Sequence, residues 1–117
     1  MDVTDDCVFC DQSRITTPNL SRWSSSNGAQ HLVFEPLAPV VPGHLLVVPV
    51  AHIADATENP RIAAGAMEVA ALVARRYPAA NIITSIGPAA TQTVFHLHLH
   101  VVPRSPYDAL SLPWDRR

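Results

Sequence analysis

The chain has 117 residues, of which 48% are apolar and 15% charged, and its formal net charge is −2 at neutral pH. This size suits one compact domain covering residues 1–117. The near-neutral charge gives no reason to expect a nucleic-acid polymer or an anionic membrane as a partner. All eight basic residues are arginines, which excludes catalysis by a lysine.

The sequence also carries no signal for a membrane or for secretion. No apolar run approaches the roughly 18 residues of a membrane span. The first ten residues, MDVTDDCVFC, lack the charged start and apolar middle of a signal peptide. We therefore expect a cytoplasmic protein.

The N-terminal segment contains both cysteines of the chain. Cys7 and Cys10 form a C-x-x-C motif. In a reducing compartment such a pair favours metal or redox chemistry over a structural disulfide, and no βαβ pattern surrounds it to support a thioredoxin-like role. The polar residues 11–30 predict a loop, with a turn at the Ser-Ser-Ser-Asn-Gly run 24–28.

Two apolar runs follow, and each predicts a strand. Residues 31–35 read HLVFE and residues 44–50 read HLLVVPV. The connection 36–43 contains three prolines, which cannot serve a hydrogen-bonded ladder. His31, at the start of the first run, is expected at the surface.

A helix is the clearest element of the sequence. Asn59 is suited to cap it, and Pro60 suits the first helical position. Apolar residues then recur at steps of three and four, and these are Ile62, Ala66, Val69, Val73 and Tyr77. Pro78 ends the pattern.

The remainder of the chain predicts a strand at 81–86, a loop at 87–92, a long strand at 93–103 and an irregular tail at 105–117. Together the elements indicate an α+β fold. We expect a mostly antiparallel, five-stranded sheet with one main helix packed on it.

The last strand carries His96, His98 and His100 at alternate positions. Side chains two residues apart on a strand point to the same face, so the three rings are expected in one row. The row is compatible with a polar stripe, with a metal-binding site, and with a nucleophilic imidazole flanked by orienting partners.

Several motifs resemble those of the histidine triad (HIT) nucleotide hydrolases and transferases. HLHLHVV fits the family's His-x-His-x-His-x-x pattern, and PGHLLVVPVAH at 42–52 is similar to its Gly-His-apolar-Pro-x-x-His segment. Gln92 stands four residues before the first histidine of the triad, and CVFC resembles the zinc-bearing branch. The resemblance covers roughly residues 7–106.

The resemblance implies an enzyme that acts on nucleoside phosphoramidates, dinucleoside polyphosphates or related nucleotidyl conjugates. It makes His98 the nucleophile that attacks the α-phosphorus and forms a covalent nucleotidyl-histidine, with His100 and His44 orienting the site. It further implies that Gln92, Thr93 and Ser85 contact the phosphate or the leaving group. A free imidazole nitrogen requires the proton on the other nitrogen, held by an acceptor such as a backbone carbonyl.

The resemblance also supplies two further ligands for the cysteine pair. Zinc takes four nitrogen or sulfur ligands, and the family pattern adds His52 and His96 to Cys7 and Cys10. The implied zinc is structural, because all four positions are filled by the protein. The alternative is a pair of small buried or free thiols.

Three positions depart from the family pattern. Pro36 stands where many members carry an acidic residue, Val50 where a lysine is frequent, and Ser85 where an asparagine is common. Glu35, next to Pro36, is expected either to reach the ribose hydroxyls or to be a solvated strand residue. Arg104 is expected either to meet a distal phosphate or to be an ordinary surface arginine.

The family resemblance implies a homodimer. Two other functions remain open at this stage. One is a nucleotide-binding protein that keeps the fold with little turnover. The other is a metal-dependent hydrolase that uses the histidine row as an open metal site.

Overall fold

The computed structural model describes residues 7–17 and 19–115. In chain order the elements are a 3₁₀ helix η1 (Gln12–Arg14), β1 (Ser21–Ser24), β2 (Gln30–Phe34), β3 (Leu45–Pro49), α1 (Pro60–Ala74), β4 (Ala80–Ile83), a 3₁₀ helix η2 (Pro88–Ala90) and β5 (Leu99–Pro103). Within this part of the chain, no helix has the length and apolar character needed to cross a membrane.

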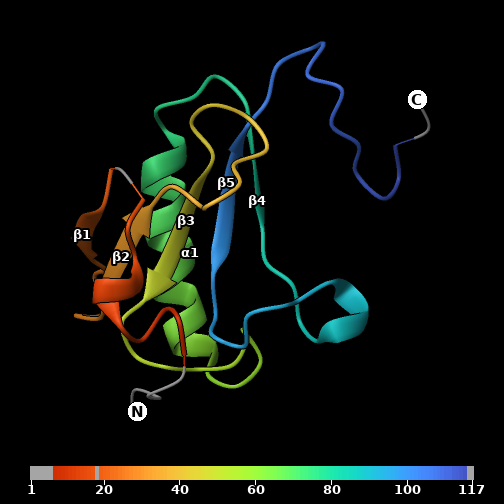
Figure 1. Ribbon diagram of the computed structural model, residues 1–117. Coiled ribbons are helices and arrows are strands. Elements are labelled where there is room, and N and C mark those ends of the chain that lie inside the picture. The colour runs from red at the N-terminus through yellow and green to blue at the C-terminus, as the bar shows by residue number, and fades with distance from the viewer. Residues whose placement is uncertain (1–6, 18, 116–117) are drawn as a thin grey trace.

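The five strands form one sheet in the order β1-β2-β3-β5-β4. Every neighbouring pair is antiparallel, and α1 lies across one face of the sheet (Figure 1). The expected α+β architecture of five strands and one main helix is thus confirmed.

Each face of the sheet has its own apolar layer. On the helix side, Val47, Leu99 and Val101 pack with Val69 and Val73 of α1. On the opposite side a smaller cluster forms, with Phe9 and Ile15 of the N-terminal segment packed against the sheet; its buried members are Leu32, Phe34, Leu46 and Val48. The N-terminal segment therefore covers the face of the sheet that α1 leaves open.

β1 was not expected from the sequence. Residues 21–24 pair with β2 as an edge strand, with Trp23 opposite His31. The run at 24–28 does form the turn between them, closed by hydrogen bonds from the amide of Ser25 to Ala29 and from the amide of Gly28 to Ser25. The polar composition of β1 reflects its edge position, where alternate side chains face solvent.

β5 is shorter than expected, and it begins at Leu99 instead of residue 93. In the segment before β5, Leu97 still points into the helix-side core, as the alternating pattern predicts. Instead of strand pairing, this segment has a backbone hydrogen bond of 2.7 Å from the Leu97 amide to the Ile53 carbonyl. The chain bends at residues 94–96. This bend separates His96 from the regular strand.

The cap of α1 provides a test of local stability. The Asn59 side chain accepts hydrogen bonds from the amides of Arg61 and Ile62. Replacing Asn59 by alanine leaves these amides without that acceptor, and we expect the free energy of unfolding to fall by about 1 kcal/mol. Urea denaturation measures this change. An Asn59→Asp variant keeps the acceptor and is expected to match the wild type, so equal losses in both variants would contradict the capping role.

His31 is buried, which makes the expectation of a surface position wrong. It lies in β2 between Trp23 of β1 and Pro49 of β3. Neither ring nitrogen has a partner with the geometry of a full hydrogen bond among the described residues. Burial lowers the pKa of His31, and the nearby backbone of Ala29 and the negative charge of Glu68 on α1 oppose that shift only in part. The ring is therefore neutral in the folded protein at neutral pH.

We expect this neutral histidine to make the fold sensitive to acid. The unfolded chain binds a proton at His31 near pH 6.5, whereas the folded chain binds it only at lower pH, so stability falls as the pH drops below about 6.5. Between pH 7.5 and 5.5 a His31→Leu variant should lose less of its free energy of unfolding than the wild type. Denaturant titrations at both pH values measure the difference. Parallel pH dependence in the two proteins would contradict it.

Candidate active site and metal centre

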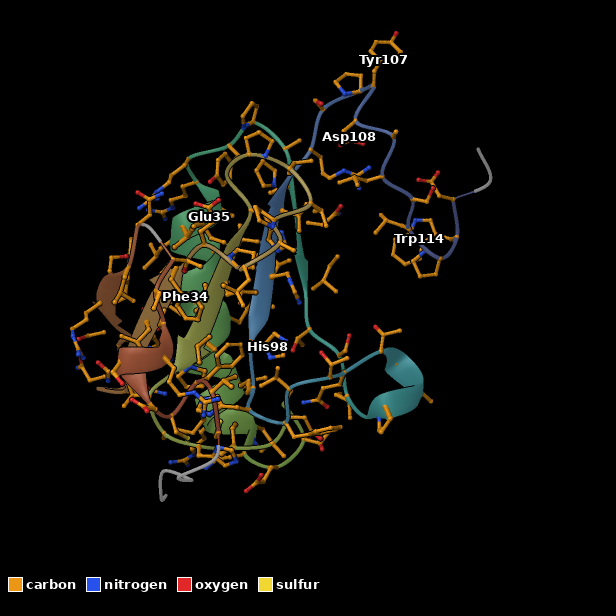
Figure 2. All side chains as sticks on the ribbon, viewed as in Figure 1. Phe34, Glu35, His98, Tyr107, Asp108 and Trp114 are labelled. Carbon is orange, nitrogen blue, oxygen red and sulfur yellow. The ribbon has the colours of Figure 1, made fainter. Side chains whose placement is uncertain are left out.

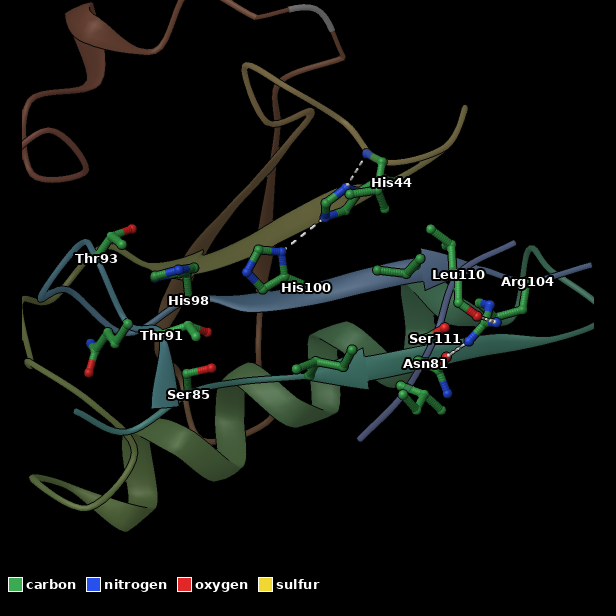
Figure 3. Close-up of a pocket in the computed structure, with 15 residues that line it drawn as sticks. His44, Asn81, Ser85, Thr91, Thr93, His98, His100, Arg104, Leu110 and Ser111 are labelled. Carbon is green, nitrogen blue, oxygen red and sulfur yellow. Dashed lines mark hydrogen bonds between the residues drawn. The ribbon is translucent and has the colours of Figure 1, made fainter. Parts of the chain in front are cut away.

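The three histidines of the row enter three different environments. His96 turns toward the cysteines, His98 bonds to the backbone, and His100 contacts His44. Figure 3 shows His100 on β5, His98 just before the start of this strand, and His44 beside His100. The three histidines therefore do not form a single site, because each ring has a different hydrogen-bond partner.

Four ligand atoms converge where the N-terminal segment meets the sheet. The Nδ1 atoms of His52 and His96 lie 3.1 Å apart, Cys10 Sγ lies 3.2 Å from His52 Nδ1, and Cys7 Sγ lies 3.4 Å from His96 Nδ1. All four atoms lie within 4.8 Å of one another. The cysteines form no disulfide.

The three nitrogen–nitrogen and nitrogen–sulfur separations are close to, and slightly shorter than, the edges of a tetrahedron around zinc. Zinc bond lengths imply roughly 3.3 Å between two nitrogens and roughly 3.6 Å between nitrogen and sulfur. His96 Nε2 lies 2.7 Å from the carbonyl of Pro49, to which it donates, so the lone pair of Nδ1 faces the cluster. Burial lowers the pKa of His96 to about 4, which keeps this ring neutral. The residues brought together fit a metal ion.

His98 is held in one tautomer by the backbone. Its Nδ1 lies 2.8 Å from the carbonyl oxygen of His96, which can only accept, so Nδ1 carries the proton and Nε2 carries the lone pair. The backbone of His98 is fixed in turn, because Thr84 Oγ1 donates to its carbonyl over 2.8 Å. The edge of Phe9 packs against the ring at a centroid distance of 5.3 Å.

A chain of hydrogen bonds fixes the protons of His44 and His100. The amide of Val40 donates to His44 Nδ1 over 3.1 Å, so the proton of a neutral His44 is on Nε2. That nitrogen lies 2.9 Å from His100 Nδ1 and donates to it. His100 is left with its own proton on Nε2 as a further donor.

Both rings are neutral at neutral pH. Burial lowers the pKa of His100 to about 4, and the neighbouring His98 and His44 rings add to the shift. Burial also lowers the pKa of His44, opposed by the negative charge of Glu35. The pair thus offers hydrogen-bond donors without a fixed positive charge.

Two cavities meet at His98 and His100. The first, of about 440 Å³, runs along β4 and β5. Ser85, Thr91, Thr93 and His98 lie at one end of it (Figure 3). The hydroxyl-bearing residues Ser85 and Thr93, both expected at the phosphate, therefore share this end of the cavity with His98.

The second cavity, of about 430 Å³, lies on the other side of the two histidines. Its wall includes Phe9, Phe34 and Leu46, with Glu35 and Pro36 at the start of the loop that follows β2. In Figure 2, Phe34 and Glu35 lie on the opposite side of His98 from the C-terminal tail. The cavity combines aromatic walls with one carboxylate.

Both polar atoms of the Gln92 side chain form hydrogen bonds within the protein. Its side chain accepts from the amide of Gly87 over 2.8 Å and donates to the carbonyls of Ala54 and Val94 over 2.6 and 3.1 Å. It is buried. These contacts brace the loop that carries Thr93, and Gln92 also lines the first cavity, so the expected contact with phosphate stays a prediction.

Arg104 is neither a free phosphate ligand nor an ordinary surface residue. It forms an ion pair of 2.7 Å with Asp108 and also donates to the side chain of Asn81. Arg104 lies at the end of the first cavity that is distant from His98 (Figure 3).

Residues 28–107 match the family model described as HIT domain. The chain belongs to the HIT family. A HIT-like protein of Mycobacterium tuberculosis whose function is uncharacterized is 34% identical over 91% of this chain and 76% of its own length. The adenylylsulfatase HINT3 of Arabidopsis thaliana is 31% identical over 90% of this chain, which spans 55% of that protein.

A solved structure supports the assignment of the metal centre. The Zn-bound histidine triad family protein of Mycobacterium smegmatis is 32% identical to this chain, with a TM-score of 0.72 over 96% of this chain and 83% of that chain. The cluster of Cys7, Cys10, His52 and His96 fits a metal site of the zinc-bearing HIT branch.

Three contacts of the site were not expected from the sequence. They are the Phe9 ring against His98, the hydroxyl of Thr84 on the His98 carbonyl, and the amide of Val40 on His44. The contact of Phe9 had one signal in the sequence. Phe9 stands between Cys7 and Cys10, and a metal held by these cysteines and His96 would bring Phe9 close to the histidine triad. The other two depend on backbone positions that no motif specifies.

Proposed function

We propose that the chain is a nucleotide hydrolase or nucleotidyl transferase that cleaves its substrate at the α-phosphorus through a covalent nucleotidyl-histidine on His98. The observation that carries the proposal is the bond between His98 Nδ1 and the His96 carbonyl. It leaves the lone pair on Nε2, and a neutral imidazole nitrogen is an effective nucleophile. The relative named as an adenylylsulfatase supports chemistry at a nucleotide.

The two cavities accommodate the two halves of such a substrate. The second cavity suits a nucleoside, with the base against Phe9 and Phe34 and the ribose hydroxyls donating to Glu35. The α-phosphate then lies between the cavities, next to His98 and His100. Thr93 and Ser85 are positioned to donate to its oxygens from the first cavity, which also receives the leaving group.

The reaction proceeds in two displacements. His98 Nε2 attacks the α-phosphorus while the bond to the leaving group breaks, and that group departs with the electron pair; an amine leaving group takes up a proton from solvent as it departs. The phosphorylated ring is cationic, and its Nδ1–H remains bonded to the carbonyl of His96. Water or another hydroxyl acceptor then attacks phosphorus and releases its proton to solvent, while the bond to Nε2 breaks and its electron pair returns to the ring of His98.

The surroundings of His98 stabilise the charge that develops. His100 is neutral at neutral pH and presents its Nε2–H, set by the relay from Val40 through His44. Donors fixed before the reaction lower the barrier without reorganising during it. The relay therefore positions a donor at the phosphate.

The cluster of Cys7, Cys10, His52 and His96 would hold a structural zinc ion. Bound there, the ion supplies a cross-link between the N-terminal segment and the sheet. Because Phe9 lies between the cysteines and packs on His98, the cross-link also fixes one wall of the nucleoside cavity. The ion takes no part in the displacement at phosphorus.

A panel of adenosine and guanosine phosphoramidates and dinucleoside polyphosphates tests the proposal. The expected product is a nucleoside monophosphate. Tight nucleotide binding without any turnover would instead identify a binding protein that keeps the fold. Instant, reversible loss of activity on chelation, with folding intact, would identify a metal-dependent hydrolase, although the described cluster includes neither His98 nor His100.

We also propose that the chain forms a homodimer. β4 is an edge strand of the sheet, and Ile83 and Ile86 are exposed at and beyond its end. An open edge of this kind gains from a partner. Sedimentation equilibrium at micromolar concentration tests this, with a mass of twice 12.7 kDa expected.

A further inference from the structure

The proposed reaction uses only one end of the first cavity. From His98 the cavity continues along β4 and β5 to Asn81, Arg104, Leu110 and Ser111 (Figure 3). A group attached to the α-phosphorus and directed away from the nucleoside would enter this space. The far end of the cavity is therefore positioned to determine which leaving groups are accepted.

Arg104 organises that far end. Its Nε and Nη2 donate to the two carboxylate oxygens of Asp108 over 2.7 and 3.1 Å. Nη2 also donates to the carbonyl of Leu110 over 2.9 Å, and Nη1 donates to Asn81 Oδ1 over 2.6 Å. Its backbone amide is bonded to the carbonyl of Ala79. The side chains of Arg104 and Asp108 are 14% and 6% exposed.

Asp108 holds the tail in place around this ion pair. It accepts from the amides of Ser105 and Leu110, each over 3.0 Å. Hydrogen bonds from Arg104 hold the pKa of Asp108 well below its usual range, so the carboxylate stays ionised. Ala109, which lies between Asp108 and Leu110 in the sequence, has a φ of 63°. This left-handed conformation costs energy for a residue with a side chain. The ion pair stabilises this turn and fixes Leu110 as part of the cavity wall.

Among the described residues, none provides an available cation at the far end of the cavity. Four of the five N–H donors of Arg104 are engaged, and Asp108 neutralises its charge. Arg104 is the one arginine among the described residues that line the cavity, and the chain has no lysine. The apolar part of the wall consists of Val40, Ile83, Val102, Leu110 and Leu112.

We propose that the Arg104–Asp108 ion pair makes this cavity selective for leaving groups that are uncharged in the substrate, such as an alkyl or aryl amide, over a nucleoside polyphosphate. The inference rests on the proposed function. An oligophosphate would bring several negative charges into a neutral, largely apolar space that offers it no free cation. An alkyl or aryl group gains from the same walls by burying apolar surface.

Two substrates that share the same adenylyl group test the selectivity. We expect kcat/KM for adenosine 5′-(N-hexyl)phosphoramidate to exceed that for diadenosine triphosphate by at least about tenfold. If both substrates react through His98 at equal rates, or if the triphosphate reacts faster, the inference is wrong while the proposed function stands. If neither reacts, the proposed function fails.

Variants that change the charge at the far end of the cavity test whether the ion pair, and not another feature, causes the selectivity between the two substrates. Asp108→Asn keeps the shape of the side chain but releases the charge of Arg104, and should raise kcat/KM for the triphosphate about fivefold or more relative to the hexyl amide. Asp11→Asn changes a carboxylate outside the cavity and should leave the ratio unchanged. An unchanged ratio in Asp108→Asn would overturn the inference.

Asn81→Asp tests the same point in case Asp108→Asn does not fold. It keeps an acceptor for Arg104 and adds a negative charge to the far end. We expect kcat/KM for the triphosphate to fall about fivefold or more, with less than about a twofold change for the hexyl amide. Equal changes in kcat/KM for both substrates would show that the far end of the cavity does not discriminate by the charge of the leaving group.

Discussion

Replacing His98 by asparagine is expected to reduce kcat by at least about 10⁴-fold, because the variant lacks the nucleophile itself. The asparagine amide can still donate to the carbonyl of His96, which His98 Nδ1 contacts in the wild type. The fold and the nucleotide cavities should therefore persist. Turnover of an adenosine phosphoramidate under substrate saturation measures the loss.

Measurements of folding, zinc content and nucleotide binding on His98→Asn provide the control for this prediction. Thermal unfolding, zinc content and nucleotide affinity of His98→Asn should equal those of the wild type, since His98 belongs neither to the core clusters nor to the cysteine cluster. Retention of more than about 1% of wild-type kcat would exclude His98 as the nucleophile.

Replacing Cys10 by serine is expected to abolish zinc binding and to lower the free energy of unfolding by more than about 4 kcal/mol, as loss of a structural metal does. A serine hydroxyl is a poor ligand for zinc compared with a thiolate. Cys10 Sγ lies 3.2 Å from His52 Nδ1 and 3.5 Å from His96 Nδ1, so its loss opens one vertex of the tetrahedron. Metal analysis and chemical denaturation measure the two effects.

Two comparisons make the metal prediction specific. Wild-type protein treated with a strong chelator should reach the stability of Cys10→Ser, and His31→Leu, which removes a histidine outside the cluster, should keep about one zinc per chain. A wild-type protein purified in the presence of zinc that binds none would contradict the metal site.

The sequence predicts the architecture well because its strongest patterns are periodic. The helical stripe of Ala66, Val69 and Val73 is buried, and Asn59 caps the helix as expected. The apolar runs that became β2 and β3 lie within one or two residues of their expected bounds. These signals are local, so they can be recognised without knowledge of the tertiary structure.

The errors have a different physical origin. A polar edge strand such as β1 buries too little apolar surface to produce an alternating pattern, and it forms because β2 offers a ladder. His31 is a polar residue type inside the core, which composition cannot anticipate. The bend at 94–96 accompanies the contacts of His96 with Cys7 and His52, residues distant in sequence.

At the site, the motifs predicted which residues lie close together better than which contacts each residue makes. They placed His44 with His100 and joined the two cysteines to His52 and His96. They did not show that Gln92 bonds to Gly87 and Ala54, or that Asp108 neutralises Arg104. Such pairings depend on loop geometry, for which this sequence contains no repeating pattern.

The attack of His98 Nε2 on phosphorus is tested most directly by intact-mass spectrometry of protein quenched during turnover under alkaline denaturing conditions, which preserve a phosphorus–nitrogen bond. We expect a mass increase of one nucleotidyl group, located by peptide mapping to His98 and absent from His98→Asn. Steady turnover by the wild type with the adduct on another residue, or with no adduct under conditions that accumulate the intermediate, would contradict the mechanism.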